Sequence, residues 1–383
     1  MNVIFVSNQP FPFGMAGSKR IRLFAEYLSI KNDVSVLVVG KNNGQNNSSG
    51  LKNKVKFNFF YFNRIQNIFG YLKIKKLITE NYKTEKKNVL YLYDGIGLTN
   101  FLYAKYGKKI GFKVVTDIVE DYSMHTERTG FLLTLLHNVN RYFEKRTFQF
   151  TDGVIVLSTR LFLKLNALNP KNKPLVLIPV SAENLFFNYS DKKEEVAFNF
   201  LYSGSYGVKD GVDLLIEAFN KVSTSFNESK LILAGNITRE IKEKIRLNPA
   251  IIYKGLIPDN NYYEFISSGN VLLMTRINSE YANSGFPFKL GEYLATGNPV
   301  IATKVSDVET YLKDKEDVIL AEPSNVGSLI SAMEFVINNR NNISSIGANG
   351  RKRCAQFFNP RINGEKLEVF LTQLFKNDTA IAK

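Results

Sequence analysis

The residues best suited to chemistry lie between positions 284 and 292. Lys289 and Glu292 stand three positions apart, and Ser284 and Gly285 before them are typical of a loop. A lysine in the first turn of a helix opposes the helix dipole unless an anion lies nearby. The free N–H groups of a helix N-terminus bind phosphate, and a carboxylate can accept hydrogen bonds from ribose hydroxyls. The pattern favours a nucleotide-phosphate site, and an exposed Lys289–Glu292 ion pair is the alternative.

A second segment suited to phosphate spans residues 203–211. Gly204, Ser205 and Gly211 follow an apolar run, and Lys209 comes just before a helical pattern. Backbone N–H groups of such a loop can cradle a phosphate, although the spacing is not that of a Walker loop. We therefore expect Lys209 and Lys289 to share one diphosphate.

Carboxylates form a third group of candidates. Glu120 and Asp121 follow the apolar run 113–118, and open α/β sheets hold ligands at the carboxyl ends of their strands. A capping or salt-bridge role is the equal alternative for both acids. His125 and His137 are the only histidines, and His125 is a weaker candidate.

The elements around Lys289 follow from local rules. Pro287 suits the first helical position, and Leu290 and Leu294 then share one helix face. Gly297 suits a left-handed C-terminal residue, and residues 300–302 read as a buried strand. The sequence thus predicts a loop, a short helix, a tight stop and a strand.

Strands and helices alternate along the chain, which predicts a doubly wound α/β fold. The polar segment 41–54 is predicted to be a surface loop, residues 131–150 one long helix, and residues 180–195 a linker. Strands are expected at 3–7, 33–40, 57–62, 89–93, 113–118, 175–179, 198–202, 230–234, 251–254, 271–275, 300–302 and 318–321, and a turn with a strand at 151–158.

Composition narrows the functional classes. The 383 residues suffice for two domains, and 44% apolar content is ordinary for a globular protein. No apolar run approaches the roughly 18 residues of a membrane-spanning helix. The single cysteine, Cys354, excludes an internal disulfide, and there is no Cys/His cluster for a metal. The first residues carry no charged n-region, so we expect no export signal and a cytoplasmic location.

Positive charge is concentrated in the first half of the chain. Residues 1–190 hold 27 Lys and Arg against 12 Asp and Glu, whereas residues 191–383 hold 23 of each kind. Basic and aromatic residues alternate in the amphipathic stretch 63–87. This distribution suggests contact with an anionic membrane surface, and a solvated helix face is the alternative.

The segment 283–303 resembles the C-terminal signature of glycosyltransferase family 4, the retaining sugar-nucleotide transferases of GT-B fold. Members carry a Glu, seven residues, a second Glu and then a Leu-Ala-x-Gly-x-Pro-Val-Ile-Ala run. Glu292 matches the second Glu, whereas the first falls on Ser284. The resemblance covers nearly the whole chain and is most specific between residues 198 and 303.

The resemblance implies two Rossmann-like domains that face each other across a cleft. Residues 1–182 would bind the acceptor, residues 196–358 would bind the nucleotide sugar, and a C-terminal helix within 359–383 would cross back to the first domain. Glu292 would hold the donor ribose, and Glu120 and Asp121 would lie near the transferred sugar. The donor-binding residues would be Gly17, Gly204, Ser205, Lys209, Gly211, Ser284, Gly285, Phe286, Pro287, Lys289 and Glu292.

The resemblance also implies the reaction. A sugar would pass with retention from a nucleoside-diphosphate sugar to a glycan or lipid-linked acceptor, in bacterial surface polysaccharide or glycolipid biosynthesis. Lys209 and Lys289 would neutralise the leaving diphosphate. The chain contains no Asp-x-Asp motif, so neither a metal nor another cofactor is expected.

Rival interpretations remain at this point. A sugar-nucleotide epimerase of the same fold would turn over the donor alone, and a basic surface-binding module would show salt-sensitive binding without catalysis. An inactive family member is a further alternative. We expect no nucleic-acid partner, and the missing Gly-x-Gly-x-x-Gly fingerprint disfavours a dehydrogenase.

Overall fold

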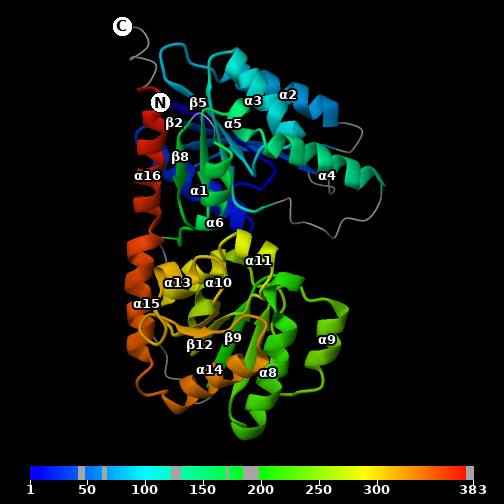
Figure 1. Ribbon diagram of the computed structural model, residues 1–383, viewed down its shortest axis with the longest axis vertical. Coiled ribbons are helices and arrows are strands. Elements are labelled where there is room, and N and C mark those ends of the chain that lie inside the picture. Colours follow the sequence, from blue (N-terminus) through cyan, green and yellow to red (C-terminus); the bar gives the residue numbers. More distant parts are fainter. Residues whose placement is uncertain (42–47, 63–66, 122–130, 170–171, 184–197, 377–383) are drawn as a thin grey trace. The chain divides into compact units, whose positions relative to one another are not determined.

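Two mostly parallel sheets organise the chain, and each belongs to a separate unit (Figure 1). The computed structural model describes residues 1–41, 48–62, 67–121, 131–169, 172–183 and 198–376. The first unit comprises Met1–Pro179 with Pro360–Lys383, and the second comprises Val180–Asn359.

The sheet of the first unit has eight strands in the order β3-β4-β2-β1-β5-β6-β7-β8. All neighbours are parallel except β3 and β4. The chain adds strands on one side of β1 and then on the other, so the strand order reverses between β1 and β5. The strands are β1 (Asn2–Ser7), β2 (Asp33–Lys41), β3 (Ser48–Lys52), β4 (Val55–Phe62), β5 (Asn88–Tyr93), β6 (Lys113–Ile118), β7 (Gly153–Val156) and β8 (Leu175–Leu177).

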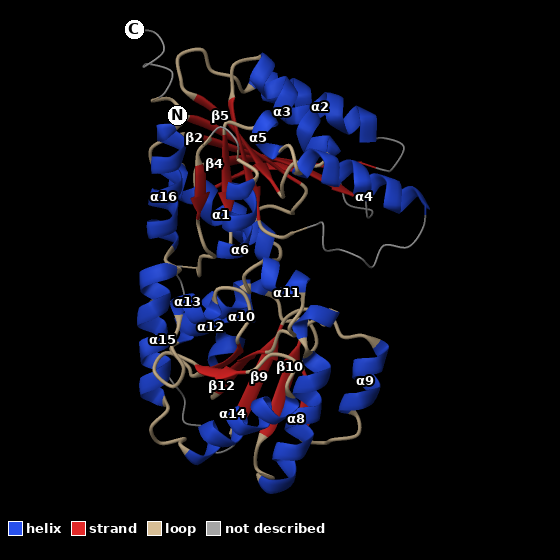
Figure 2. Ribbon diagram, viewed as in Figure 1, coloured by secondary structure: helices blue, strands red, loops and turns tan. Residues whose placement is uncertain are grey.

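Helices cover both faces of this sheet, which explains why β1 and β5 are buried along their whole length. α1 packs with α16, whereas α2 and α4 both pack with α3. Figure 2 shows these two groups on either side of the strands. The helices are α1 (Ala16–Leu28), α2 (Asn67–Glu80), α3 (Leu98–Lys109), α4 (Phe131–Glu144), α5 (Thr147–Phe150), α6 (Thr159–Ala167) and α16 (Pro360–Gln373).

The second unit has a six-stranded parallel sheet in the order β11-β10-β9-β12-β13-β14, and its strand order reverses between β9 and β12. The strands are β9 (Asn199–Ser203), β10 (Lys230–Ala234), β11 (Ile251–Tyr253), β12 (Val271–Met274), β13 (Val300–Thr303) and β14 (Ile319–Ala321). The helices are η3 (Val208–Asp210), α8 (Val212–Ser225), α9 (Arg239–Ile245), α10 (Asp259–Ser267), α11 (Glu280–Ser284), α12 (Phe288–Thr296), α13 (Val308–Tyr311), α14 (Val326–Asn338) and α15 (Ser344–Phe357).

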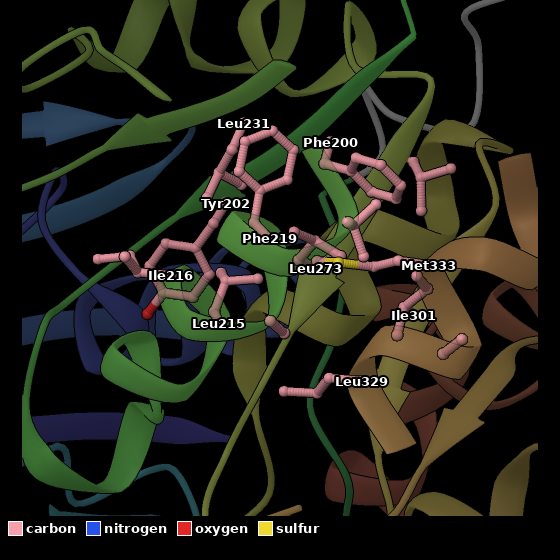
Figure 3. Close-up of a cluster of buried hydrophobic side chains, with 14 of the residues drawn as sticks. Phe200, Tyr202, Leu215, Ile216, Phe219, Leu231, Leu273, Ile301, Leu329 and Met333 are labelled. Atoms are coloured by element: carbon pink, nitrogen blue, oxygen red, sulfur yellow. The ribbon is translucent and has the colours of Figure 1, made fainter. Parts of the chain in front are cut away.

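The core of the second unit lies between its sheet and the helices α8 and α14. Phe200 and Tyr202 of β9 are fully buried there beside Phe219 and Met333 (Figure 3). Burying aromatic and aliphatic side chains of this size contributes about 1.5–3 kcal/mol each. The carboxyl end of β9 is therefore anchored by large buried side chains.

The predicted doubly wound architecture is confirmed, and two local predictions are wrong. Residues 48–52, expected in a loop, form β3, because they pair antiparallel with the following strand β4. The predicted helix 131–150 is interrupted between α4 and α5. The Thr147 hydroxyl donates to the Glu144 carbonyl at 2.7 Å, a local side-chain bond that competes with continued helix.

A buried ion pair joins α1 to the sheet of the first unit. Arg20 donates to both carboxylate oxygens of Asp117, at 2.7 and 3.0 Å, and to the carbonyls of Ile178 and Pro179. Tyr91 donates to the same carboxylate at 2.6 Å. Every partner of the guanidinium is thus fixed by backbone or buried side chains.

Replacing Arg20 by methionine should destabilise the protein by about 3–5 kcal/mol, because Asp117 would be left as a buried charge without its cation. The measurement is the urea unfolding midpoint. Arg361→Met is the matched control, since Arg361 forms an exposed pair with Glu365 and should shift stability by less than about 1 kcal/mol. Equal shifts in the two variants would contradict this assignment.

Candidate functional site

Ser284 lies in a helix and not in the loop that its sequence suggests. It is the last residue of α11, and Gly285 follows in an extended conformation. The Ser284 hydroxyl is buried and donates to the Tyr281 carbonyl at 2.9 Å. The prediction of a loop at Ser284 is therefore wrong, because its hydroxyl closes the last turn of α11.

Phe286 and Pro287 connect α11 to α12. The Phe286 ring is buried against Phe358, with centroids 5.4 Å apart, so it anchors the loop within the second unit. Pro287 was predicted to be the first helical residue, but it is the N-cap, and α12 begins one residue later at Phe288. The Pro287 carbonyl accepts from the Leu290 N–H at 3.1 Å. Gly297 ends α12 at φ +77°, as its position predicts.

Lys289 points into a buried polar cluster. Its Nζ atom lies 2.8 Å from the Tyr202 hydroxyl, 4.2 Å from the centre of that ring and 3.5 Å from Oδ1 of Asp210. The other Asp210 oxygen accepts from the Ser205 hydroxyl at 2.6 Å. Glycine at 204 leaves room for the ammonium group, because a Cβ atom there would touch Nζ.

The pKa of the Lys289 ammonium group is strongly shifted. Burial lowers its pKa to about 8, the negative charge of Asp210 opposes that shift, and the positive charges of Arg276 and Lys209 add to it. Side chains of Lys289 and Asp210 are only 14% and 3% exposed. Lys209 and Arg276 are therefore close enough to act electrostatically on Lys289.

Gly211 fixes the turn that carries Lys209. It has φ +64° and is the N-cap of α8, and a Cβ atom at this position would collide with the Thr275 carbonyl oxygen. Lys209 extends to Tyr281 of α11, with Nζ 3.1 Å from the hydroxyl and 4.3 Å from the ring centre. The structure thus brings Gly211, Lys209 and α11 together at the carboxyl edge of the sheet.

Glu292 lies on the same helix as Lys289. It is 3% exposed, and the Tyr262 hydroxyl of α10 donates to its Oε2 atom at 3.2 Å. The alternative of a solvent-exposed Lys289–Glu292 pair is excluded by this burial. A buried carboxylate that already accepts from one hydroxyl is suited to further hydroxyl donors such as a diol.

In the first unit, Gly17 lies in the first turn of α1, after the loop that follows β1. A Cβ atom on Gly17 would lie 2.8 Å from the Tyr93 hydroxyl and 2.9 Å from Gln9, so only glycine fits without a shift. Tyr93 ends β5, the strand beside β1. Gly17 therefore lies where the strand order of this sheet reverses.

Glu120 and Asp121 have different surroundings. Asp121 is buried, and its Oδ1 atom accepts from Lys164 Nζ at 2.7 Å, while Glu144 accepts from the same ammonium at 3.1 Å. This pairing matches the salt-bridge alternative for Asp121. Glu120 lines a cavity of about 200 Å³, together with Asp94, Gly95, Ile96, Gly97, Ile118, His137, Asn140, Arg141 and Glu144. His125 lies outside the described residues.

Lys209, Asp210, Arg276 and Lys289 form a charged cluster at the carboxyl edge of the second sheet. Two of them, Asp210 and Arg276, were not predicted from the sequence. Asp210 follows Lys209 directly, and Arg276 follows β12 by two positions. Position after a buried strand is a usable signal, but it identifies a site residue only when the order of strands is known.

Within the described part of the chain, no three His, Cys, Asp or Glu side chains are grouped so that they could hold a metal ion. The same residues include no helix of the length and apolar character that crossing a membrane requires.

Comparisons with known proteins point to glycosyltransferases. Residues 197–339 match the family model described as "Glycosyl transferases group 1". An uncharacterized glycosyltransferase of Methanocaldococcus jannaschii is 27% identical over 218 residues, which is 57% of this chain and 58% of that protein. The matched part of the second unit is thus similar in sequence to glycosyltransferases.

Solved structures extend the likeness to nearly the whole chain. Sucrose-phosphate synthase from Thermosynechococcus elongatus has a TM-score of 0.77 at 16% identity, covering 98% of this chain and 99% of its own. The fold is GT-B. A second GT-B structure, Anabaena HepE in complex with UDP, has a TM-score of 0.71 at 14% identity and covers 97% of this chain and 100% of its own. The two parallel-sheet units are therefore the two Rossmann-like domains of the GT-B fold, and α16, which belongs to the first of them, is the predicted returning helix.

Asp210→Asn should lower the pKa of Lys289 below its value of about 8. The carboxylate charge that favours the ammonium form would be lost, whereas burial would remain. The measurement is a pH titration of lysine side-chain carbon signals by NMR.

Asp213→Asn is the matched control, because Asp213 is exposed on α8 and pairs with Lys244. That change should leave the Lys289 titration where it is. If the pKa of Lys289 were unchanged in Asp210→Asn, the Asp210 carboxylate would not be stabilising the protonated form of Lys289.

Proposed function

We propose that this chain is a retaining glycosyltransferase that moves a sugar from a nucleoside-diphosphate sugar to an acceptor hydroxyl. One observation carries the proposal: at the carboxyl edge of the second sheet the charge of Lys209 acts on the buried Lys289, and Glu292 is buried on the helix that carries Lys289. A diphosphate needs concentrated positive charge, and a ribose diol needs a hydrogen-bond acceptor. The UDP complex of HepE, a protein of the same fold, supports a nucleotide ligand.

In the reaction proposed, the bond between the sugar anomeric carbon and the diphosphate oxygen breaks, and its electron pair stays on that oxygen. The acceptor hydroxyl oxygen attacks the same face of the anomeric carbon, and its proton passes to the departing phosphate. Lys209 and Lys289 stabilise the negative charge that develops on the leaving diphosphate. The N-termini of α8 and α12 add partial positive charge.

The first unit would bind the acceptor. The cavity beside Glu120 supports this role, since its carboxylates and Asn140 can accept hydrogen bonds from sugar hydroxyls. Glu120 is the acid proposed to lie near the reacting hydroxyl. The charge balance that we propose needs neither a metal nor another cofactor, because the lysines would supply the positive charge.

A lipid-linked acceptor of a bacterial surface polysaccharide or glycolipid fits the basic first half of the chain. On α2, Leu72 and Lys76 are exposed, and Lys73 lies 4.3 Å above the Phe60 ring. Apolar and basic side chains on one exposed helix favour contact with anionic lipid headgroups. Such contact would make the enzyme peripheral on the inner face of the membrane.

Lys289→Ala should lower kcat by about 100-fold or more, because a group that stabilises the leaving group would be lost. First, a thermal-shift screen of UDP-, GDP-, ADP- and dTDP-sugars identifies the donor, and turnover is then measured with it. Lys313→Ala, on an exposed lysine of the same unit, is the control and should leave kcat unchanged.

Three outcomes would overturn the proposal. They are no melting shift with any of these nucleotides, near-normal turnover in Lys289→Ala, and epimerisation of the donor in the absence of any acceptor. The last result would favour the epimerase. A surface-binding module would be favoured if the protein showed no turnover and bound polyanions equally well with and without the Glu292→Ala change.

Cosedimentation with vesicles tests the membrane contact. Vesicles of phosphatidylcholine with phosphatidylglycerol should bind the protein at low salt and release it at high salt, because exposed charges are screened. Leu72→Ser should weaken this binding, and pure phosphatidylcholine vesicles should bind poorly. Equal binding to both vesicle types would contradict the proposed surface.

A further inference from the structure

Arg276 lies at the point where the strand order of the second sheet reverses. It follows β12, which is the neighbour of β9 in the sheet. Lys209 and Asp210 come after β9, so the two loops emerge side by side at the carboxyl edge. In open α/β sheets, ligands bind at this position.

Hydrogen bonds on both sides of Arg276 join its loop to the turn that carries Lys209. The Thr275 hydroxyl donates to the Asp210 carbonyl at 3.0 Å, and the Ile277 N–H donates to the Lys209 carbonyl at 3.1 Å. The Arg276 carbonyl accepts from the Thr303 hydroxyl at 2.8 Å. The backbone at 276 is therefore held in place from three directions.

The guanidinium group has unused hydrogen-bonding capacity. Its Nε atom is shielded from solvent and has no hydrogen-bond partner among the residues that the structure describes. Its Nη1 atom lies 3.5 Å from the Ala282 carbonyl of α11, at the long limit of a hydrogen bond. A buried donor without a partner is destabilising, and a ligand acceptor would recover that loss.

The electrostatics point in the same direction. The positive charge of Arg276 acts on Lys289 and on Tyr202, so all three side chains belong to one cluster. Lys209, Arg276 and Lys289 bring three positive charges, and Asp210 and the buried Glu292 bring two negative ones. The net charge of these five side chains is therefore positive, which favours an anionic ligand such as the diphosphate of a nucleoside-diphosphate sugar.

We propose that Arg276 is a third cationic ligand of the diphosphate and that it selects diphosphates over monophosphates. This inference rests on the proposed function, because it names a further residue of the same site. Arginine suits the role, since its planar fork donates two parallel hydrogen bonds to phosphate oxygens in a fixed geometry, whereas a lysine acts as a point charge. With Lys209 and Lys289 on separate elements, Arg276 would let the site contact both phosphates.

Isothermal titration of UDP, GDP, ADP and dTDP, and of the matching monophosphates, tests the inference. For the base that the wild type prefers, Arg276→Gln should weaken diphosphate binding by about 10-fold to 100-fold, the range for hydrogen bonds to a charged group. Monophosphate binding should change by less than about threefold. Arg276→Lys should restore only part of the loss, because it returns the charge without the fork.

Arg239→Gln is the matched control, since Arg239 is an exposed arginine of α9 in the same unit, and it should change neither affinity. Melting temperatures of all variants check that each one is folded. A purely structural role for Arg276 would weaken diphosphate and monophosphate to the same extent.

The outcomes separate the two proposals. If the wild type binds none of the four diphosphates, the proposed function fails. Suppose instead that the wild type binds one of the diphosphates. The inference on Arg276 is then wrong if Arg276→Gln binds that diphosphate equally well, or if it loses affinity for the diphosphate and the monophosphate to the same extent. The proposed function stands in both cases.

Discussion

The buried ammonium group of Lys289 is the constraint on which the second unit's candidate site depends. Removing a charge from water is costly unless partners replace the water, and here Asp210 and the Tyr202 hydroxyl replace it. Lys289 and its two partners come from three separate elements, α12, η3 and β9. The ring of Tyr202 lies in the hydrophobic core (Figure 3), so core packing fixes the position of a hydroxyl that contacts the lysine. Core and site are therefore coupled through one side chain.

Backbone contacts at the carboxyl edge make this arrangement rigid. Gly211 and Thr275 approach each other more closely than a side chain on residue 211 would allow. The hydrogen bonds from Thr275 and Ile277 then join the loop after β12 to the turn after β9. Because the charged side chains are attached to a backbone that is already fixed, these loops need little further ordering when a ligand binds, and less conformational entropy is lost.

Local rules predicted much of the architecture but not the composition of the charged cluster. Periodicity and caps were enough for β1, β6 and the helix, stop and strand around α12, because these depend on residues close in sequence. Asp210 and Arg276 become site residues only through the adjacency of β9 and β12, which no local pattern specifies. The same holds for β3, which exists by pairing with β4. Ser284 reads as loop because α11 is too short for a periodic signal.

Buried charges in the two units differ in how they are neutralised. In the first unit, Arg20 with Asp117 and Lys164 with Asp121 form pairs in which a cation meets a carboxylate directly. In the second, Asp210 pairs with Lys289, on which the positive charges of Lys209 and Arg276 also act. That carboxylate favours the charged form of Lys289, which burial alone would suppress. A neutral lysine would not attract an anionic ligand. Asp210 therefore has two opposite effects: its negative charge weakens the attraction between the site and an anion, but it also keeps Lys289 protonated and positively charged.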